Sequence, residues 1–150
     1  MSANLLKWLR GAVVTLLVLL VIQFEFGMAV NLSDLPSISP FGFSLPGVLS
    51  VLNQIGFVAL FHAVLGTALT IFALITLVLA LASKIRSVQI LGVLGFVSMV
   101  LAAAMGLYFV LSGLQNDGYS HGMATNFILT FVFYFLEMYL LKPTAKARAN

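Results

Sequence analysis

Four long apolar runs, separated by short polar segments, form the dominant pattern of this 150-residue chain. The runs cover approximately residues 11–30, 57–82, 88–111 and 121–141. Each is close to the roughly 20 residues that an α-helix needs to cross the hydrocarbon core of a bilayer. The pattern therefore predicts an all-α membrane protein, with residues 1–150 forming one domain that is a bundle of four transmembrane helices.

The segment between the first two runs divides into two parts. Residues 31–46 contain three prolines, which lack a backbone donor and resist regular helix, so this part is predicted to be an exposed loop. Residues 47–56 place apolar side chains opposite Ser50, Asn53 and Gln54 at helical spacing. This part is predicted either as a short interfacial helix or as an extension of the second span.

Composition and charge support a membrane location and predict an orientation. Hydrophobic residues make up 62% of the chain and charged residues 7%, whereas soluble domains carry about 25% charged residues. Every basic residue flanks an apolar run: Lys7, Arg10, Lys84, Arg86, Lys142, Lys146 and Arg148. By the positive-inside rule, both termini are predicted to be cytoplasmic in a multi-pass protein of the cell (plasma) membrane. The expected partner of these charges is membrane lipid and not nucleic acid.

Two groups of side chains predict contacts between helices. Ser98, Ala102 and Gly106 are small residues at four-residue spacing, which predicts a face where a neighbouring helix approaches closely. Asn126, Thr130 and Glu137 share one face of the fourth run. This polar stripe is predicted to pack against another helix, with a proton path as the alternative.

The chain has only two histidines, His62 and His121, and each lies near the start of an even-numbered run. In the predicted topology both runs begin at the outer face, so the two imidazoles are expected at similar depth. Ionisable groups inside membrane spans are costly and often mark function. Two imidazoles facing each other suit the axial positions of a haem iron (b, o or a type), and Gly66, one turn after His62, would leave space for a porphyrin edge. Zinc is less well suited, since a catalytic zinc site has three protein ligands.

The residues also allow a reading without a cofactor. His62 could hydrogen-bond a neighbouring helix while His121 caps a loop, and the chain would then be a non-catalytic membrane subunit or assembly factor. Glu25 lies near the outer end of the first run. It could be a catalytic proton carrier, a partner of an imidazole N–H, or an interfacial side chain that reaches water.

The histidine segments FHAVLG, around His62, and SHGMATN, around His121, resemble one half of haem A synthase. The resemblance implies a haem-binding oxidoreductase that oxidises a haem methyl group, and a homodimer, because larger members fuse two such halves. The family's helix-two pattern is similar to Glu-x-x-His-Arg, but this chain has Ala59 and Ala63 at the acid and arginine positions, and it lacks the loop cysteines. Haem binding tolerates these losses more easily than oxidation chemistry, in which Glu25 would have to replace the missing acid. The rival haem-binding function is a b-type cytochrome that passes electrons to a quinone or a respiratory-complex partner.

Overall fold

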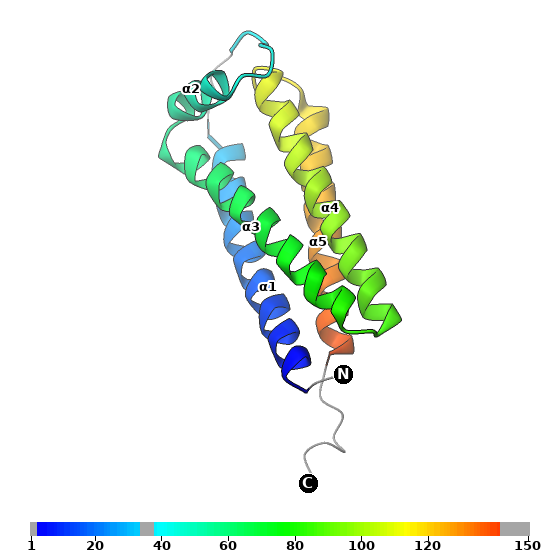
Figure 1. Ribbon diagram of the computed structural model, residues 1–150. Helices are drawn as coiled ribbons and strands as arrows, with labels where there is room; N and C mark the ends of the chain where they lie inside the picture. The colour runs from blue at the N-terminus through cyan, green and yellow to red at the C-terminus, as the bar shows by residue number, and fades with distance from the viewer. Residues whose placement is uncertain (1–2, 34–37, 142–150) are drawn as a thin grey trace.

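The computed structural model describes residues 3–33 and 38–141, and these ranges form helices without strands. The helices are α1 (Ala3–Asn31), α2 (Leu45–Ile55), α3 (Phe57–Ala82), α4 (Arg86–Leu111) and α5 (Asp117–Leu140) (Figure 1). Four of them, α1, α3, α4 and α5, are long and apolar enough to cross a membrane. The predicted bundle of four long apolar helices is therefore confirmed.

The long helices pack in a ring. α3 contacts α1 and α4, and α5 also contacts α1 and α4, whereas α3 and α5 lie diagonally and do not contact each other among the described residues. α3 and α5 both begin at the end of the bundle that carries α2, here called the α2 end (Figure 1). The opposite end, where α1 begins, is here called the N-terminal end.

Two helices begin about one turn or more before the predicted runs, α1 and α5, and α4 begins two residues early. α1 begins at Ala3 because Lys7 and Arg10 are good helix formers whose exposed side chains do not interrupt the helix. α5 begins at Asp117 because the side chain of Asn116 caps the helix, accepting a hydrogen bond from the Gly118 amide at 3.0 Å. His121 therefore lies about one turn inside α5, and not at its first residue.

α2 is a separate helix and not an extension of the second span. The Ser44 side chain caps its start by accepting a hydrogen bond from the Gly47 amide at 3.2 Å. At its end Gly56 has a φ of 101°, a backbone conformation that residues other than glycine rarely adopt. The chain changes direction there, and α2 packs on α3 with Val51 and Leu52 buried.

Part of the predicted loop lies against the turn that follows α4. The amide of Ile38 donates to the Gly113 carbonyl at 3.4 Å, and the amide of Phe41 donates to the Leu111 carbonyl at 3.1 Å. Gly113 has a φ of 72°, and a Cβ there would collide with the Ile38 carbonyl. This position therefore requires glycine for both its conformation and the close approach.

The predicted packing face on α4 is confirmed. Ser98 and Ala102 are buried, and a Cβ on Gly106 would lie 3.0 Å from the sulfur of Met123 on α5. A Cβ on Gly95 would similarly lie 3.0 Å from the ring of Tyr134. Small residues on α4 therefore allow side chains of α5 to pack directly against its backbone.

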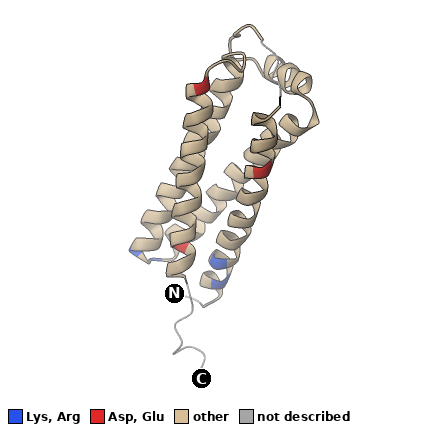
Figure 2. Ribbon diagram, turned by 180° about the vertical axis from the view of Figure 1, so that it is seen from behind, with Lys and Arg blue, Asp and Glu red and all other residues tan. Residues whose placement is uncertain are grey.

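The Lys and Arg residues are unevenly distributed between the two ends of the bundle. Figure 2 shows that the described Lys and Arg residues lie on the ribbon at the N-terminal end. They are Lys7, Arg10, Lys84 and Arg86, whereas Lys142, Lys146 and Arg148 lie outside the described residues. All the described basic side chains therefore lie at the same end of the bundle.

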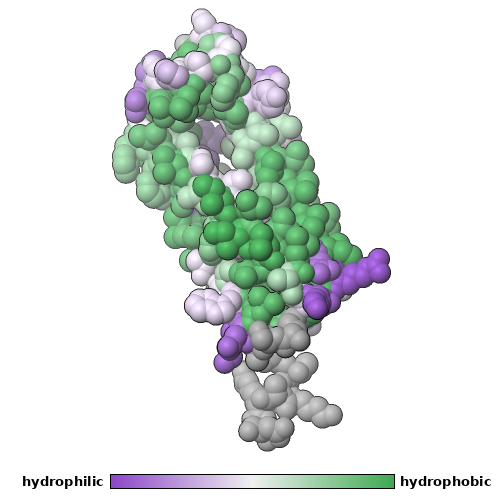
Figure 3. All heavy atoms as spheres, viewed as in Figure 1, coloured by the Kyte–Doolittle hydropathy of each residue, from purple (hydrophilic) through white to green (hydrophobic). Residues whose placement is uncertain are grey.

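Buried side chains are concentrated in the half of the bundle nearer the N-terminal end. The apolar core there comprises Leu9, Val13, Leu16, Leu17, Leu20, Leu69, Ala73, Ala80, Val88, Met99 and Tyr134. Toward the α2 end the four long helices contribute residues 24–31, 57–68, 103–111 and 117–129, all of them described, and only Ala59 among these is buried, while Gln23, Met99 and Ala102 are buried just outside these segments. Figure 3 shows the surface hollowed between α3 and α4 in this part of the molecule. We call these four segments the unfilled half.

Candidate functional site

His62 lies in the second turn of α3, half-buried against α1. The amide nitrogen of Gln23 on α1 lies 3.4 Å from His62 Nε2 and donates a hydrogen bond to the His62 carbonyl at 3.1 Å. His62 Nδ1 and Gln23 Oε1 are both buried, and neither has a hydrogen-bond partner among the described residues. An apolar interface therefore contains a polar pair with two unsatisfied atoms, a combination that is unfavourable unless something else pairs with them.

Two glycines make room for this pair. A Cβ on Gly27 of α1 would lie 2.9 Å from His62 Cε1, and a Cβ on Gly66 of α3 would lie 3.0 Å from the Gln23 amide nitrogen. The two contacts are reciprocal, because each helix places its polar residue against a glycine of the other. Gly66, the residue predicted to leave space beside a porphyrin, thus lies next to Gln23 of α1.

His121 lies on α5, and its side chain is exposed. With a rise of 1.5 Å per residue, His62 is about 8 Å and His121 about 6 Å from the first residue of its own helix. Both helices begin at the α2 end (Figure 1). Both histidines therefore lie toward the α2 end of the bundle, on the diagonal helices α3 and α5.

Glu25 occupies a different face of α1 from Gln23. The two positions are about 200° apart around the helix, and the Glu25 side chain is exposed, whereas Gln23 is 7% exposed. The side chain next to His62 is thus the amide of Gln23 and not the carboxylate of Glu25. Gln23 was not among the predicted site residues, although one signal was present: Gln23 and Gly27 have the same four-residue spacing as His62 and Gly66.

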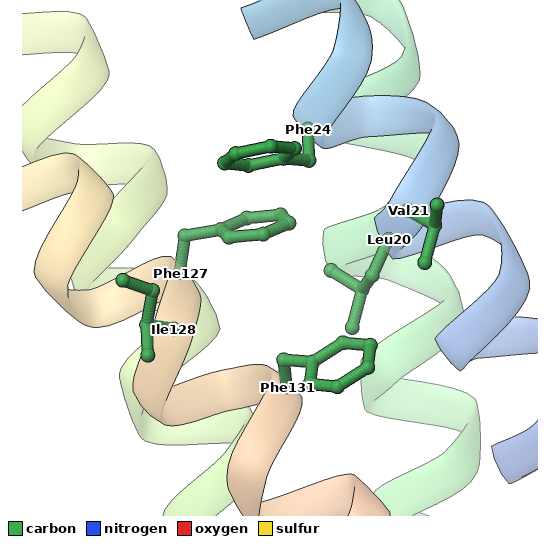
Figure 4. A pocket seen from close by; sticks show the side chains of 6 residues that line it. All are labelled: Leu20, Val21, Phe24, Phe127, Ile128 and Phe131. Carbon is green, nitrogen blue, oxygen red and sulfur yellow. The ribbon is translucent and has the colours of Figure 1, made fainter. Parts of the chain in front are cut away.

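Aromatic side chains line the region between α1 and α5. Figure 4 shows a groove of about 230 Å³ whose lining is entirely apolar: Leu20, Val21, Phe24, Phe127, Ile128 and Phe131. The rings of Phe24 and Phe127 are stacked with centroids 6.0 Å apart. A second ring pair, Phe26 and Phe61, joins α1 to α3 at 4.5 Å. The groove and the two ring pairs lie close to the unfilled half. Their apolar surfaces could contact an apolar ring or chain of a ligand.

Comparisons of the chain with models of known protein families, with curated protein sequences and with solved structures each found no match. The fold and the site by themselves define the class: a helical bundle with four helices long enough to cross a membrane and a histidine–glutamine pair between two of them. Among the described residues, no three His, Asp or Glu side chains come together in a way that could hold a metal ion. A haem iron, in contrast, needs only two axial ligands from the protein.

Proposed function

We propose that this protein is an integral protein of the cell membrane that binds haem through His62 and His121. The basic residues at the N-terminal end support an orientation with both termini in the cytoplasm, because positive charge accumulates on the cytoplasmic side of membrane proteins. In this orientation the α2 end faces outward. Both histidines then lie near the outer surface of the membrane.

The observation that carries the proposal is that the two histidines lie in the unfilled half. Protein interiors are normally packed as closely as organic crystals, and the other half of this bundle follows that rule with a continuous core. In the unfilled half the same four helices bury only Ala59 among the described residues. A flat apolar macrocycle would lie between the helices of the unfilled half. His62 and His121, both toward the α2 end, would supply its nitrogen ligands.

The two donor residues differ in their surroundings. His121 is exposed, so its ring is accessible, but it lies about 180° around α5 from the buried Thr130 and is not on that helix's buried face. At His62 the 3.4 Å separation from the Gln23 amide is longer than a typical N–H donor distance of about 2.9–3.0 Å, so that contact can be given up. Gln23 would still donate to the His62 carbonyl and hold the backbone in place.

A bound haem would supply one-electron redox chemistry or would itself be the substrate whose methyl group is oxidised. In both cases His62 and His121 would bind and orient it, while aromatic side chains such as Phe24 and Phe127 would exclude water. A b-type cytochrome would exchange electrons with a quinone or a respiratory-complex partner. A haem A synthase-like enzyme would in addition need a proton-accepting group, for which we propose Glu25, and it would act as a homodimer.

A specific observation favours a second candidate function. His62 packs against Gly27 and pairs with Gln23, as a histidine that only joins two helices would do. The protein would then be a membrane subunit or assembly factor without a cofactor. Under this function the exposed ring of His121 would have no specific role.

An absorption spectrum of the protein purified after expression with ample haem separates the two functions. We expect a Soret band of low-spin haem that is lost or shifted in the variants His62→Ala and His121→Ala. Asn53→Ala provides a matched control, because Asn53 is exposed on α2 and its loss should leave the spectrum unchanged. A wild-type protein without a Soret band would rule out haem binding. Mass analysis of haem extracted from a host supplied with haem O would then distinguish an enzyme, which makes haem A or its hydroxylated intermediate, from a cytochrome.

A further inference from the structure

A buried acid lies in the filled half of the bundle, far from the histidines. Glu137, near the end of α5, is 0% exposed. A Cβ on Gly92 of α4 would lie 3.8 Å from its Oε2 atom and 2.8 Å from the Cβ of Ala80 on α3. Small residues thus bring α3 and α4 into contact beside the carboxyl group. The packing shields this group from both water and lipid.

Tyr134 lies one turn before Glu137 on the same face of α5 and is also 0% exposed. Its ring packs on Gly95 of α4. The Tyr134 hydroxyl and both carboxyl oxygens of Glu137 are buried and have no hydrogen-bond partner among the described residues. Three oxygen atoms without partners therefore lie along a single turn of the helix, in surroundings that are otherwise apolar.

Two of the other buried hydroxyl groups donate within their own helices. The buried hydroxyl of Thr130 donates to the Asn126 carbonyl at 2.8 Å, and that of Thr76 on α3 donates to the Phe72 carbonyl at 3.0 Å. Of the basic residues at this end of the bundle, Lys84 and Arg86 are exposed in and after the turn between α3 and α4, and Lys142 lies outside the described residues. The described surroundings thus contain neither a hydrogen bond nor a buried positive charge that would stabilise an ionised carboxylate.

A proton is the ligand that fits these oxygens. Burying an ionised carboxylate without a partner is far more costly than burying the neutral acid. Hard cations such as Ca²⁺ take six to eight oxygen ligands, whereas the site offers three side-chain oxygens without partners. Glu137 lies about one turn from the last residue of α5, Leu140, at the end of the bundle that carries the described basic residues, so in the proposed orientation water would be about one turn away.

We propose that Glu137 and Tyr134 form a proton-binding site that exchanges its proton with water at the N-terminal end of the bundle. The site is independent of haem binding. From it, the buried face of α5 continues through Thr130 to Asn126 at the edge of the unfilled half. The predicted packing of this polar stripe against other helices is confirmed for Thr130 and Glu137, which are both buried, and the proton site gives the stripe a chemical role.

Infrared spectroscopy of the full chain in lipid vesicles tests this proposal. At neutral pH we expect the C=O stretch of a protonated carboxyl group, which moves to lower frequency after equilibration in D₂O. Glu137→Gln should abolish the band, and Tyr134→Phe should shift it, because the phenol is the neighbouring polar group. Asp117→Asn is the matched control, since Asp117 is exposed at the start of α5, and it should leave the band unchanged.

Three results would overturn the proposal. The first is a wild-type spectrum without a protonated carboxyl band at neutral pH, and this test needs no variant. The second is a band that survives in Glu137→Gln, and the third is a band that fails to move in D₂O. Circular dichroism of each variant verifies that the helices remain intact, and if Glu137→Gln does not fold, the wild-type protein and Tyr134→Phe still decide the matter.

Discussion

The amide nitrogen of Gln23 lies 3.4 Å from Nε2 of His62, and it donates to the carbonyl oxygen of the same residue at 3.1 Å. One glutamine on α1 thus contacts both the backbone and the ring of the histidine on α3. Because an amide N–H faces Nε2, this nitrogen acts as the acceptor, and the proton of a neutral imidazole is placed on Nδ1. In the haem-free protein the pair therefore favours the His62 tautomer that carries its proton on Nδ1.

The variant Gln23→Leu tests this tautomer assignment. We expect the nitrogen NMR signals of His62 in the haem-free protein to change from a protonated Nδ1 to a protonated Nε2, because the leucine side chain has no donor to hold Nε2 as an acceptor. The signals of His121, which is exposed on α5, should stay the same and serve as the internal control. Identical His62 signals in the two proteins would mean that Gln23 does not determine the tautomer.

Gly27 and Gly11 form a matched pair on α1. A Cβ on Gly27 would lie 2.9 Å from His62 Cε1, whereas a Cβ on Gly11 would have no atom within 4 Å. We expect Gly27→Ala to lower the free energy of unfolding by about 1–3 kcal/mol because the ring is displaced. Gly11→Ala should raise it by up to about 1 kcal/mol through better helix propensity. Thermal unfolding in detergent, followed by circular dichroism, measures both changes, and equal effects of the two variants would contradict the close approach at Gly27.

Gly113 and Gly42 provide a comparison within the loops of the α2 end. Gly113→Ala should lower the free energy of unfolding by more than about 1 kcal/mol, because alanine at a positive φ is strained and its Cβ would displace the Ile38 carbonyl. A Cβ on Gly42 would have no atom within 4 Å, so Gly42→Ala should be close to neutral. The same unfolding measurement applies. A neutral Gly113→Ala would show that residues 38–41 do not lie against this turn.

The absence of cysteine from the chain permits a direct test of orientation. Ser50 on α2 and Ser87 at the start of α4 are both exposed, at opposite ends of the bundle. On intact cells, a membrane-impermeant maleimide should label Ser50→Cys, but it should label Ser87→Cys only after the cells are permeabilised. The reverse pattern would place the termini, and the basic residues near them, outside the cell.

The sequence predicts most accurately those helix ends that carry a local chemical signal. α3 begins and ends at the predicted residues, because Gly56 precedes it and the polar turn at Ser83 and Lys84 follows it. The predicted start of α5, at residue 121, was wrong for an equally local reason. Asp117 and Gly118 resemble a turn in the sequence, but in the structure they form the first turn of a helix capped by Asn116. A sequence stretch that is compatible with both a turn and a capped helix is therefore ambiguous until the cap is seen.

The contact between Gln23 and His62 could not be predicted from the sequence for a different reason. In a helix that is apolar on every side, periodicity does not indicate which face points inward, because lipid and the protein interior are similarly apolar. The pairing depends on the rotation of α1 and α3 about their own axes. The prediction that His62 and His121 lie toward the same end of the bundle needed only the direction of the chain. The unfilled half depends on how far the helices separate, and no local pattern encodes this distance.

The uneven distribution of buried side chains has a mechanical consequence. α1, α3, α4 and α5 are held together by the continuous core of the N-terminal half, whereas between Phe57 and Ala68 of α3 only Ala59 is buried. Spreading the helices at the α2 end would therefore disrupt few tightly packed contacts, and the same movement at the other end would open the core. We therefore expect the separation of the four long helices to vary more easily at the α2 end than at the N-terminal end.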